Sequence, residues 1–238
     1  NVLPTFSYSY MTSVGRYAFY HCSDSSLSTL ELPNAISIGD YAFENICPVY
    51  FNVGCQLVSF GKRSIGTPRL QSFSISTSNP TFTCIDRVLY SNSSTNLVAY
   101  PRAKINSTGN YITSFTIRYG ARSIDEYAFW YCDNLRTINI PNTVTTIGNY
   151  AFARCYNLAS IILPDSVTSI GNHSFASCSS LATLQIGIGL STFPFDAIYQ
   201  CDQLESIDVV SSNPYLYSRN GVLFKKISPG RMTLLRMP

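Results

Sequence analysis

The sequence predicts an α/β solenoid made mostly of short parallel strands and irregular chain, with little regular helix. Similar segments return every 23 residues, and each holds apolar residues at alternate positions, as half-buried strands do. A longer repeat of 134 residues carries two segments that are typical of β-hairpins. A unit this short cannot bury its apolar side alone, so neighbouring units must stack around a shared core.

The 23-residue unit is clearest over residues 124–210. Each copy approximates Ile-Gly-x-x-Ala-Phe-x-x-Cys, followed by Leu-x-x-apolar-x-apolar. Alternating apolar residues would bury one side of a short strand, which Pro or Gly then ends. The copies begin at Ile124, Ile147, Ile170 and Phe193, with earlier copies at Val14 and Ile38.

The phenylalanine of the unit predicts an aromatic ladder. Its fixed place in every copy would bring the rings of successive coils on top of one another, with the small Ala relieving crowding beside them. Dividing the chain by the period gives about 10 coils. The predicted core positions are Phe19, Phe43, Phe129, Phe152 and Phe175, with Ile198 in the same place of the last copy.

The longer repeat predicts two tandem modules. Ser78-Asn79-Pro80 returns as Ser212-Asn213-Pro214, and each copy leads to two apolar stretches about a polar gap, which is typical of a hairpin. We expect one continuous solenoid. Its parts are a module at 1–101 with a hairpin island at 79–101, and a module at 102–238 with 23-residue repeats at about 124–210 and a C-terminal island at 213–238.

Composition argues against two classes of partner. The net charge is only +3, charged residues make up 12% of the chain, and Lys and Arg do not cluster, so nucleic acid is not expected. The sequence holds no run of eighteen apolar residues, so we expect no direct membrane insertion in this segment. The N-terminus lacks the features of a signal peptide, and we expect any targeting or anchoring signals to lie elsewhere.

The repeat motif resembles the BspA-type class of leucine-rich repeats, found on surface proteins of oral and gut bacteria and expanded in protozoan parasites of mucosal tissue. The segments at 79–90 and 213–224 also resemble that family's irregular segment. The resemblance is strong over 124–224 and looser over 44–78 and 102–118. It implies a right-handed leucine-rich-repeat superhelix, a cell-surface or secreted location, and a role in adhesion or binding.

Five of the eight cysteines occupy one position of the repeat. A position copied along a stack is usually a small buried slot, so free buried thiols are favoured over disulfides there. Cys47 and Cys55 lie outside the repeat position and could pair with each other. No Cys-x-x-Cys occurs, so neither a metal nor a cofactor is expected. The five repeat-position cysteines are Cys22, Cys132, Cys155, Cys178 and Cys201.

The sequence carries no recognisable catalytic motif. His21 adjoins Cys22, but adjacent residues of extended chain point to opposite faces, so we expect both His21 and His173 to be ordinary surface residues. A solenoid polysaccharidase would need carboxylates in register on adjacent coils. Glu31 and Asp208 occupy a strand position that holds amide or apolar residues in other coils, so the sequence favours a non-enzymatic protein.

Two surfaces are candidates for binding. One is a polar, nearly uncharged strip on the predicted concave sheet; the other is a set of aromatic residues, Tyr8, Tyr10, Tyr20, Trp130, Tyr131 and Tyr156. Either set also has a plain structural explanation, since a water-exposed sheet face is polar and the aromatics could pack the convex side. The strip consists of Arg136, Thr137, Asn139, Ser160, Ile162, Thr183, Gln185, Ser206 and Asp208.

The sequence thus predicts a cell-surface or secreted protein that adheres to, or binds, a protein or glycan of host cells, matrix or other microbes. The partner expected is a host extracellular or cell-surface protein or glycan. The alternative is a passive spacer array that projects another domain. Asn92 and Asn106 lie in Ser- and Asn-rich loops and are possible N-glycosylation sites, whereas the sequon at Asn172 lies inside the repeat.

Overall fold

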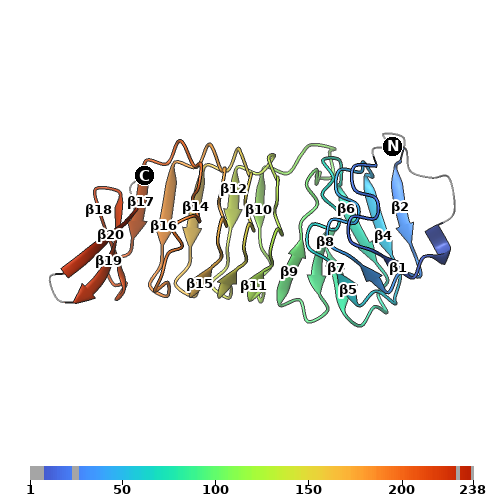
Figure 1. Ribbon diagram of the computed structural model, residues 1–238, viewed down its shortest axis with the longest axis horizontal. Coiled ribbons are helices and arrows are strands. Elements are labelled where there is room, and N and C mark those ends of the chain that lie inside the picture. Colours follow the sequence, from blue (N-terminus) through green and yellow to red (C-terminus); the bar gives the residue numbers. More distant parts are fainter. Residues whose placement is uncertain (1–7, 23–26, 229–230, 237–238) are drawn as a thin grey trace. The chain divides into compact units, whose positions relative to one another are not determined.

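The computed structural model describes residues 8–22, 27–228 and 231–236 (Figure 1). The chain divides into two compact units, Asn1–Tyr111 and Ile112–Pro238. Both are solenoids of short parallel strands, so the predicted fold class is confirmed. The α/β label fits only loosely, because the helix of the described residues is a single 3₁₀ turn, η1 (Tyr8–Tyr10).

In the first unit each coil contributes one strand to each of two parallel sheets. One sheet has the order β1-β3-β5 and the other has the order β2-β4-β6, and an antiparallel group β7-β8-β9 follows them. Alternating burial along β2 and β4 turns one side of each strand into the core. The strands are β1 (Ser13–Val14), β2 (Thr29–Leu32), β3 (Ser37–Ile38), β4 (Tyr50–Val53), β5 (Ser59–Phe60), β6 (Ser72–Ile75), β7 (Phe82–Ile85), β8 (Val88–Ser91) and β9 (Asn96–Ala99).

The second unit repeats this plan with more coils. A parallel sheet has the order β10-β12-β14-β16-β17, shorter strands β11, β13 and β15 pair in parallel, and an antiparallel sheet β18-β19-β20 follows. The strands are β10 (Ser114–Thr116), β11 (Ser123–Ile124), β12 (Thr137–Asn139), β13 (Thr146–Ile147), β14 (Ser160–Leu163), β15 (Ser169–Ile170), β16 (Thr183–Ile186), β17 (Ser206–Val209), β18 (Leu216–Arg219), β19 (Val222–Ser228) and β20 (Arg231–Arg236).

The number of coils is smaller than the length suggests. The described chain places three strands in the sheet β2-β4-β6 and five in the sheet β10-β12-β14-β16-β17. The estimate of about ten coils is therefore wrong, because each island uses a stretch of chain without adding a coil.

The aromatic ladder is present in both units. The rings of Phe129 and Phe152 stack with centroids 5.0 Å apart and an interplanar angle of 14°, and those of Phe152 and Phe175 stack at 5.5 Å and 7°. These rings are fully buried, as are Phe43 and Ile198, so the predicted core is confirmed there.

Phe19 departs from the prediction. It stacks on Phe43 at 5.1 Å but is only half-buried, and its edge contact is with Tyr8 at 6.2 Å. Phe19 lies in the first described coil, where the ladder supplies a stacking partner on one side, whereas Phe152 has a ladder ring on both sides.

The glycine of the repeat allows the coils to approach closely. A Cβ on Gly171 would lie 2.4 Å from the backbone nitrogen of Asn149 in the preceding coil, and one on Gly148 would lie 2.6 Å from that of Glu126. Gly15, at the same position of the first coil, has no atom within 4 Å of its would-be Cβ among the described residues. The glycine is therefore required by coil contact, since none of these three has a positive φ.

Each island has three strands, one more than the predicted two-stranded hairpin. The added strands are β7 and β18, which pair antiparallel with β8 and β19. A two-residue turn with positive φ at both positions joins the first two strands of each island. The turn is Asp86-Arg87 between β7 and β8, and Asn220-Gly221 between β18 and β19. Such turns match the twist of a hairpin, which explains their use here.

A buried asparagine ties each island to the preceding coil. The Asn213 side chain is 0% exposed; its Nδ2 donates to the carbonyl oxygens of Gly187 (2.8 Å) and Leu190 (3.1 Å), and its Oδ1 accepts from the backbone nitrogens of Tyr215 and Leu216 (both 2.8 Å). All four hydrogen-bonding positions of the amide are thereby filled. Asn79 makes the equivalent four bonds in the first island.

Coil contact at glycine predicts a position-dependent cost of adding one methyl group. Gly171→Ala should lower the free energy of unfolding by about 2 kcal/mol or more, because the new Cβ would overlap backbone of the preceding coil. Gly15→Ala is the matched control and should change stability by less than about 0.5 kcal/mol. Urea denaturation of both variants measures the difference; equal effects would contradict the contact.

The buried amide predicts that Asn213→Ala destabilises the second island. The change strips partners from two carbonyl groups and two backbone N–H groups, and the unfolding free energy should fall by about 3 kcal/mol. Asn172→Ala, at an exposed position of the same unit, is the control and should be near neutral. Thermal unfolding measures both; a neutral Asn213→Ala would refute the anchoring role.

Candidate functional site

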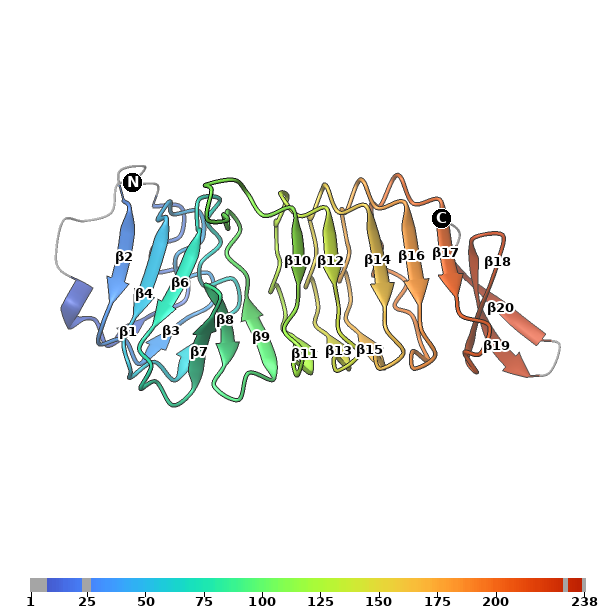
Figure 2. The ribbon, with the colours of Figure 1, turned by 180° about the vertical axis from the view of Figure 1, so that it is seen from behind.

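The sheet β10-β12-β14-β16-β17 presents two rows of outward side chains, and its strands lie in this order in Figure 2. Pairing in register aligns equivalent residues of successive coils. The first row consists of Ser114, Thr137, Ser160, Thr183 and Ser206. The second row consists of Thr116, Asn139, Ile162, Gln185 and Asp208. We call these ten residues the strip.

The predicted strip residues are brought together, with one exception and two additions. Arg136 is exposed but precedes β12, so it stands outside the rows. Ser114 and Thr116 were missed because residues 102–118 match the repeat only loosely. The alternation of apolar Phe115 and Ile117 with these polar residues could have revealed the strand, because the two lie 23 residues before Ile138 and Ile140. Phe115 and Ile117 are both buried.

The strip is hydroxyl- and amide-rich and carries one charge. Asn139 Nδ2 on β12 donates to Thr116 Oγ1 on the adjacent strand β10 (3.0 Å). Within β17, Ser206 Oγ donates to Asp208 Oδ2 (3.0 Å). Ile162, at the centre of the second row, is 60% exposed although apolar. The side chains are short and stand on a paired backbone, so the strip offers hydrogen-bonding groups and one apolar contact at fixed spacing.

The corresponding strands of the first unit carry a different surface. Glu31 and Asn52 are paired in register on β2 and β4, and Asn52 Nδ2 donates to Glu31 Oε1 (3.4 Å). In the second unit Asp208 is paired with Gln185. Each strand carboxylate therefore faces an amide on the adjacent coil, not the second carboxylate that glycoside hydrolysis needs.

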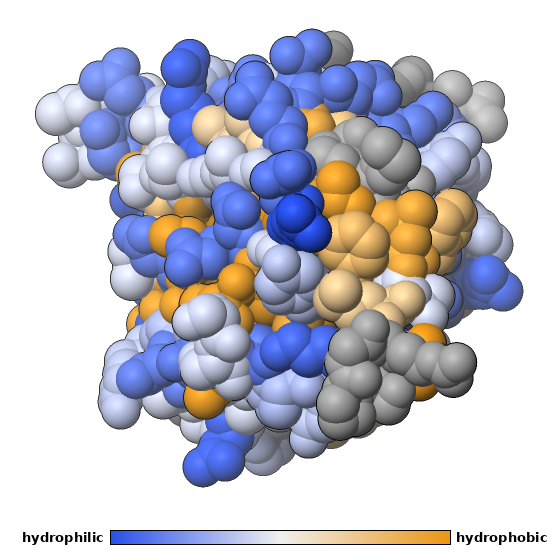
Figure 3. Space-filling view, turned by 90° about the vertical axis from the view of Figure 1, so that its left-hand side faces the viewer, coloured by the Kyte–Doolittle hydropathy of each residue, from blue (hydrophilic) through white to orange (hydrophobic). Residues whose placement is uncertain are grey.

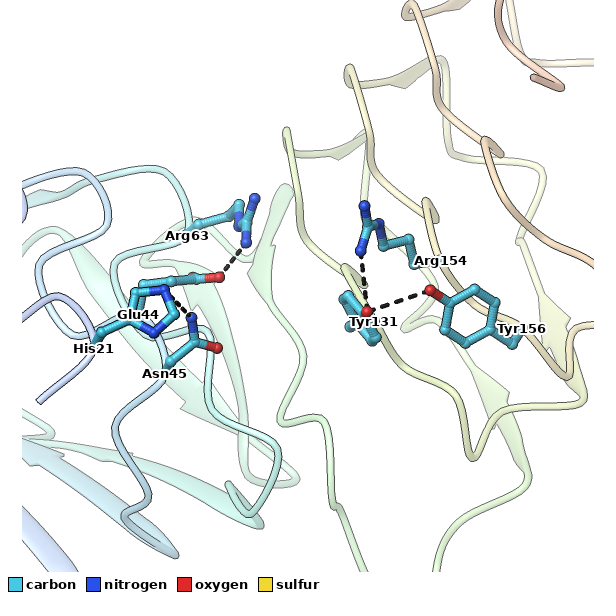
Figure 4. A network of polar contacts seen from close by, with 7 residues as sticks. All are labelled: His21, Glu44, Asn45, Arg63, Tyr131, Arg154 and Tyr156. Carbon is cyan, nitrogen blue, oxygen red and sulfur yellow. Dashed lines mark hydrogen bonds and ion pairs between the residues drawn. The ribbon is translucent and has the colours of Figure 1, made fainter. Parts of the chain in front are cut away.

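The aromatic candidates of the second unit pack against one another. Tyr131 contacts Trp130 and Tyr156 edge-on, with centroids 5.8 and 5.4 Å away. The Arg154 guanidinium lies over Trp130 and Tyr131, and its Nη1 donates to the Tyr131 hydroxyl (3.0 Å) (Figure 4). The hydrogen bond that Tyr156 donates to Tyr131, with burial adding to it, raises the pKa of the Tyr156 hydroxyl.

These contacts support the packing interpretation for Trp130, Tyr131 and Tyr156, because their rings already contact one another and Arg154. Tyr10 and Tyr20 are exposed, although the Tyr20 ring also contacts the rings of Tyr17 and His21. Tyr8 is half-buried and contacts Phe19.

A polar cluster in the first unit combines an ion pair with an amide–imidazole contact. Glu44 is buried and paired with Arg63, and Asn45 Nδ2 donates to His21 Nε2 (3.1 Å) (Figure 4). Burial raises the pKa of the Glu44 carboxyl, and the Arg63 guanidinium opposes the rise. His173, in the second unit, stacks on Tyr150 and contacts Asp196 through Nδ1 (3.0 Å).

The cysteines of the repeat are hydrogen-bond donors inside the core. Cys155 Sγ donates to the Phe129 carbonyl oxygen (3.1 Å) and Cys178 Sγ to that of Phe152 (3.2 Å), in each case across to the preceding coil. Cys132, Cys155 and Cys178 are buried, as predicted, whereas Cys22 and Cys201 are half-buried. Cys47 and Cys55 are free thiols in the structure, so the pairing considered for them is not formed.

The two candidate glycosylation sites are exposed. Asn92 Nδ2 donates to the Pro80 carbonyl oxygen (3.0 Å), whereas Asn106 engages neighbouring groups through its side-chain oxygen, which accepts from the backbone nitrogens of Thr108 and Asn110 (both 3.0 Å). Glycosylation at either site stays a prediction.

Comparison with known proteins agrees with this repeat architecture. The sequence matches the family described as "BspA type Leucine rich repeat region" in six copies, over residues 4–112 and 102–220. The chain belongs to the BspA-type leucine-rich-repeat family. None of the curated proteins compared with it matches. Within the described residues, no helix is both long and apolar enough to cross a membrane.

Solved structures of bacterial proteins are similar to this fold. A leucine-rich repeat protein from Eubacterium ventriosum is 28% identical with a TM-score of 0.72, covering 82% of this chain and 50% of that one. A leucine rich cell surface protein from Faecalibacterium prausnitzii (22%, TM-score 0.62; 84% and 64% covered) and the pneumococcal vaccine antigen PcpA (21%, 0.57; 85% and 62%) are similar in fold. The chain therefore spans half to almost two thirds of these proteins.

Burial predicts a sharp ranking of thiol reactivity. Burial raises the pKa of the Cys178 thiol well above its ordinary value, so the thiolate that alkylating reagents attack is scarce at pH 8. Cys55 is exposed and should be labelled by iodoacetamide in the folded chain, whereas Cys178 should be labelled only after unfolding in urea. Mass spectrometry of peptides from both states tests this; equal labelling of the two in the folded chain would contradict it.

Proposed function

We propose that this protein is a non-enzymatic, cell-surface or secreted adhesin that binds a protein or glycan of host cells, extracellular matrix or other microbes through the strip. The observation that carries the proposal is the pair of outward rows on five adjacent strands, in which eight of the ten residues are exposed and Ser160 and Ser206 are half-buried. Extended sheet surfaces of solenoids commonly bind macromolecules.

The physical character of the strip supports binding of a large neutral partner. Short Ser, Thr and Asn side chains lose little conformational entropy when they become ordered against a ligand. With Asp208 as the one charged group of the rows, recognition would depend on hydrogen bonds and shape, with little electrostatic steering. A polar glycan or an extended protein segment fits this chemistry.

A surface location is supported by the family and by one structural neighbour. The Faecalibacterium prausnitzii protein is described as a cell surface protein. The competing proposal is a passive spacer that projects another domain, for which the strip would be an ordinary solvated sheet face. Binding measurements separate the two.

Introduction of positive charge into the strip tests the proposal. The intact chain is screened against extracellular-matrix proteins, host cells and a glycan array, and the triple variant Asn139→Arg, Gln185→Arg and Asp208→Arg is compared on the ligand found. Binding should weaken about tenfold or more, because three long cations would displace hydrogen-bonding groups from the second row.

The matched control places the same substitution on the shorter strands of the same unit, at the exposed residues Thr146→Arg and Ser169→Arg, and should leave the affinity unchanged. Equal affinities for the strip variant and the wild-type chain would reject the strip as the binding surface. Absence of any ligand for the intact chain would favour the spacer.

A further inference from the structure

The second island is strongly basic. Its residues 213–238 include five Lys or Arg and no Asp or Glu, whereas the whole chain has a net charge of only +3. The first island, residues 79–101, carries one acidic and one basic residue, Asp86 and Arg87. The positive charge is therefore not required by the fold that the two islands share. The basic residues of the second island are Arg219, Lys225, Lys226, Arg231 and Arg236.

The sheet β18-β19-β20 brings these residues onto one element, although they stand apart in the sequence. Arg219 and Lys225 are exposed, and Lys226 Nζ donates to the Asn213 carbonyl oxygen (2.6 Å), which is a neutral acceptor. No carboxylate of the described residues forms an ion pair with any of these three cations. Their charge is therefore available to a partner.

Strand β20 is an open edge of this sheet. The strand order β18-β19-β20 gives it one neighbouring strand. On β19, Lys226 N donates to a carbonyl oxygen just before β18 (2.8 Å), so the alternation of backbone groups turns Lys225 toward its partner Thr233 on β20. By the same alternation Met232 and Leu234 turn their N–H and C=O groups away from β19. Among the described residues these four groups have no hydrogen-bond partner.

The same two residues carry exposed apolar side chains. Met232 is 51% exposed and Leu234 is 52% exposed, and Phe224, opposite Leu234 on β19, is half-buried. In Figure 3 the side of the molecule that carries the second island faces the viewer, and apolar side chains lie there beside strongly hydrophilic ones. An edge strand of this kind offers backbone donors, backbone acceptors and an apolar contact.

Two occupants of this edge are disfavoured by its residues. A second copy that paired through its own β20 would bring like charges together, because antiparallel pairing sets Arg231 opposite Arg236 and parallel pairing in register sets each arginine beside its copy. The core of a lipid bilayer is disfavoured as well, since the unpaired backbone groups of an open edge would find no partner there.

We propose that β20 binds an extended acidic peptide segment of a partner protein as a fourth strand of the island sheet. The outward N–H and C=O groups of Met232 and Leu234 pair with the peptide backbone, and apolar residues at alternate positions of the peptide cover the two exposed side chains. The positive charge of the island attracts the carboxylates of the peptide. This surface is separate from the strip, so the inference does not depend on the strip being a binding surface.

The test adds to the full chain a fluorescein-labelled peptide of about ten residues in which Glu and Val alternate. Fluorescence anisotropy should show binding that weakens between about 50 mM and about 300 mM salt, and a Lys-Val peptide of equal length should not bind. A fully N-methylated Glu-Val peptide keeps its side chains but cannot donate backbone hydrogen bonds, so it should bind about tenfold more weakly. Equal binding of the two acidic peptides would overturn the proposal, because charge alone would then explain the binding.

Amide hydrogen exchange followed by NMR locates the bound peptide. Exchange at Met232 and Leu234 should slow about tenfold or more, whereas Thr233, whose backbone pairs with β19, should change little. Unchanged exchange at Met232 and Leu234 with the peptide bound would show that it lies elsewhere.

Lys225→Glu combined with Arg231→Glu should weaken binding of the Glu-Val peptide about tenfold or more. The matched control, Arg118→Glu with Arg136→Glu, makes the same change in net charge at exposed residues outside the island and should alter the affinity less than about twofold. Equal losses in the two variants would contradict a role for the island. A concentration-dependent dimer in sedimentation without peptide, or binding to phosphatidylserine vesicles without binding to the peptide, would reject the proposal in favour of a second copy or a lipid surface.

Discussion

The separation between neighbouring coils is the constraint on which the rest of the structure depends. The ladder rings stack with centroids 5.0 to 5.5 Å apart, close to the spacing of paired strands. Within that spacing a glycine must stand where Gly171 meets the preceding backbone, and the Cys178 thiol reaches the carbonyl oxygen of Phe152. Ring, glycine and thiol are therefore three consequences of one distance, and this explains why they recur together in the motif.

The same spacing gives the protein its functional potential. Because each coil repeats the last, a side chain that points outward on one strand has a neighbour on the next, and rows of hydroxyl and amide groups arise across five strands. The buried positions are tightly specified, whereas the outward positions vary freely between Asn139, Ile162, Gln185 and Asp208. The outward surface can thus change without a change in the fold.

The sequence predicted what repeats and missed what does not. The period, the ladder and the three buried cysteines followed from positions copied along the chain. Eight of the ten strip residues followed from the alternation of the strands. Strands β7 (Phe82–Ile85) and β18 (Leu216–Arg219) were missed because they precede the two apolar stretches about a polar gap on which the hairpin prediction rested. Ser114 and Thr116 were missed because the chain before them lacks the motif, although Phe115 and Ile117 keep the alternation. The half-burial of Phe19 depends on its place in the stack, which a position in a motif does not encode.

A double-mutant cycle on the ladder tests most directly whether neighbouring coils stabilise one another. Phe152→Leu, Phe175→Leu and the double variant would be compared by urea denaturation. Stacked rings at 5.5 Å predict a coupling of about 1 kcal/mol between the two changes, since either substitution alone already removes the ring pair. Effects that add to within about 0.3 kcal/mol would contradict the account, because the coils would then be held together without the ladder.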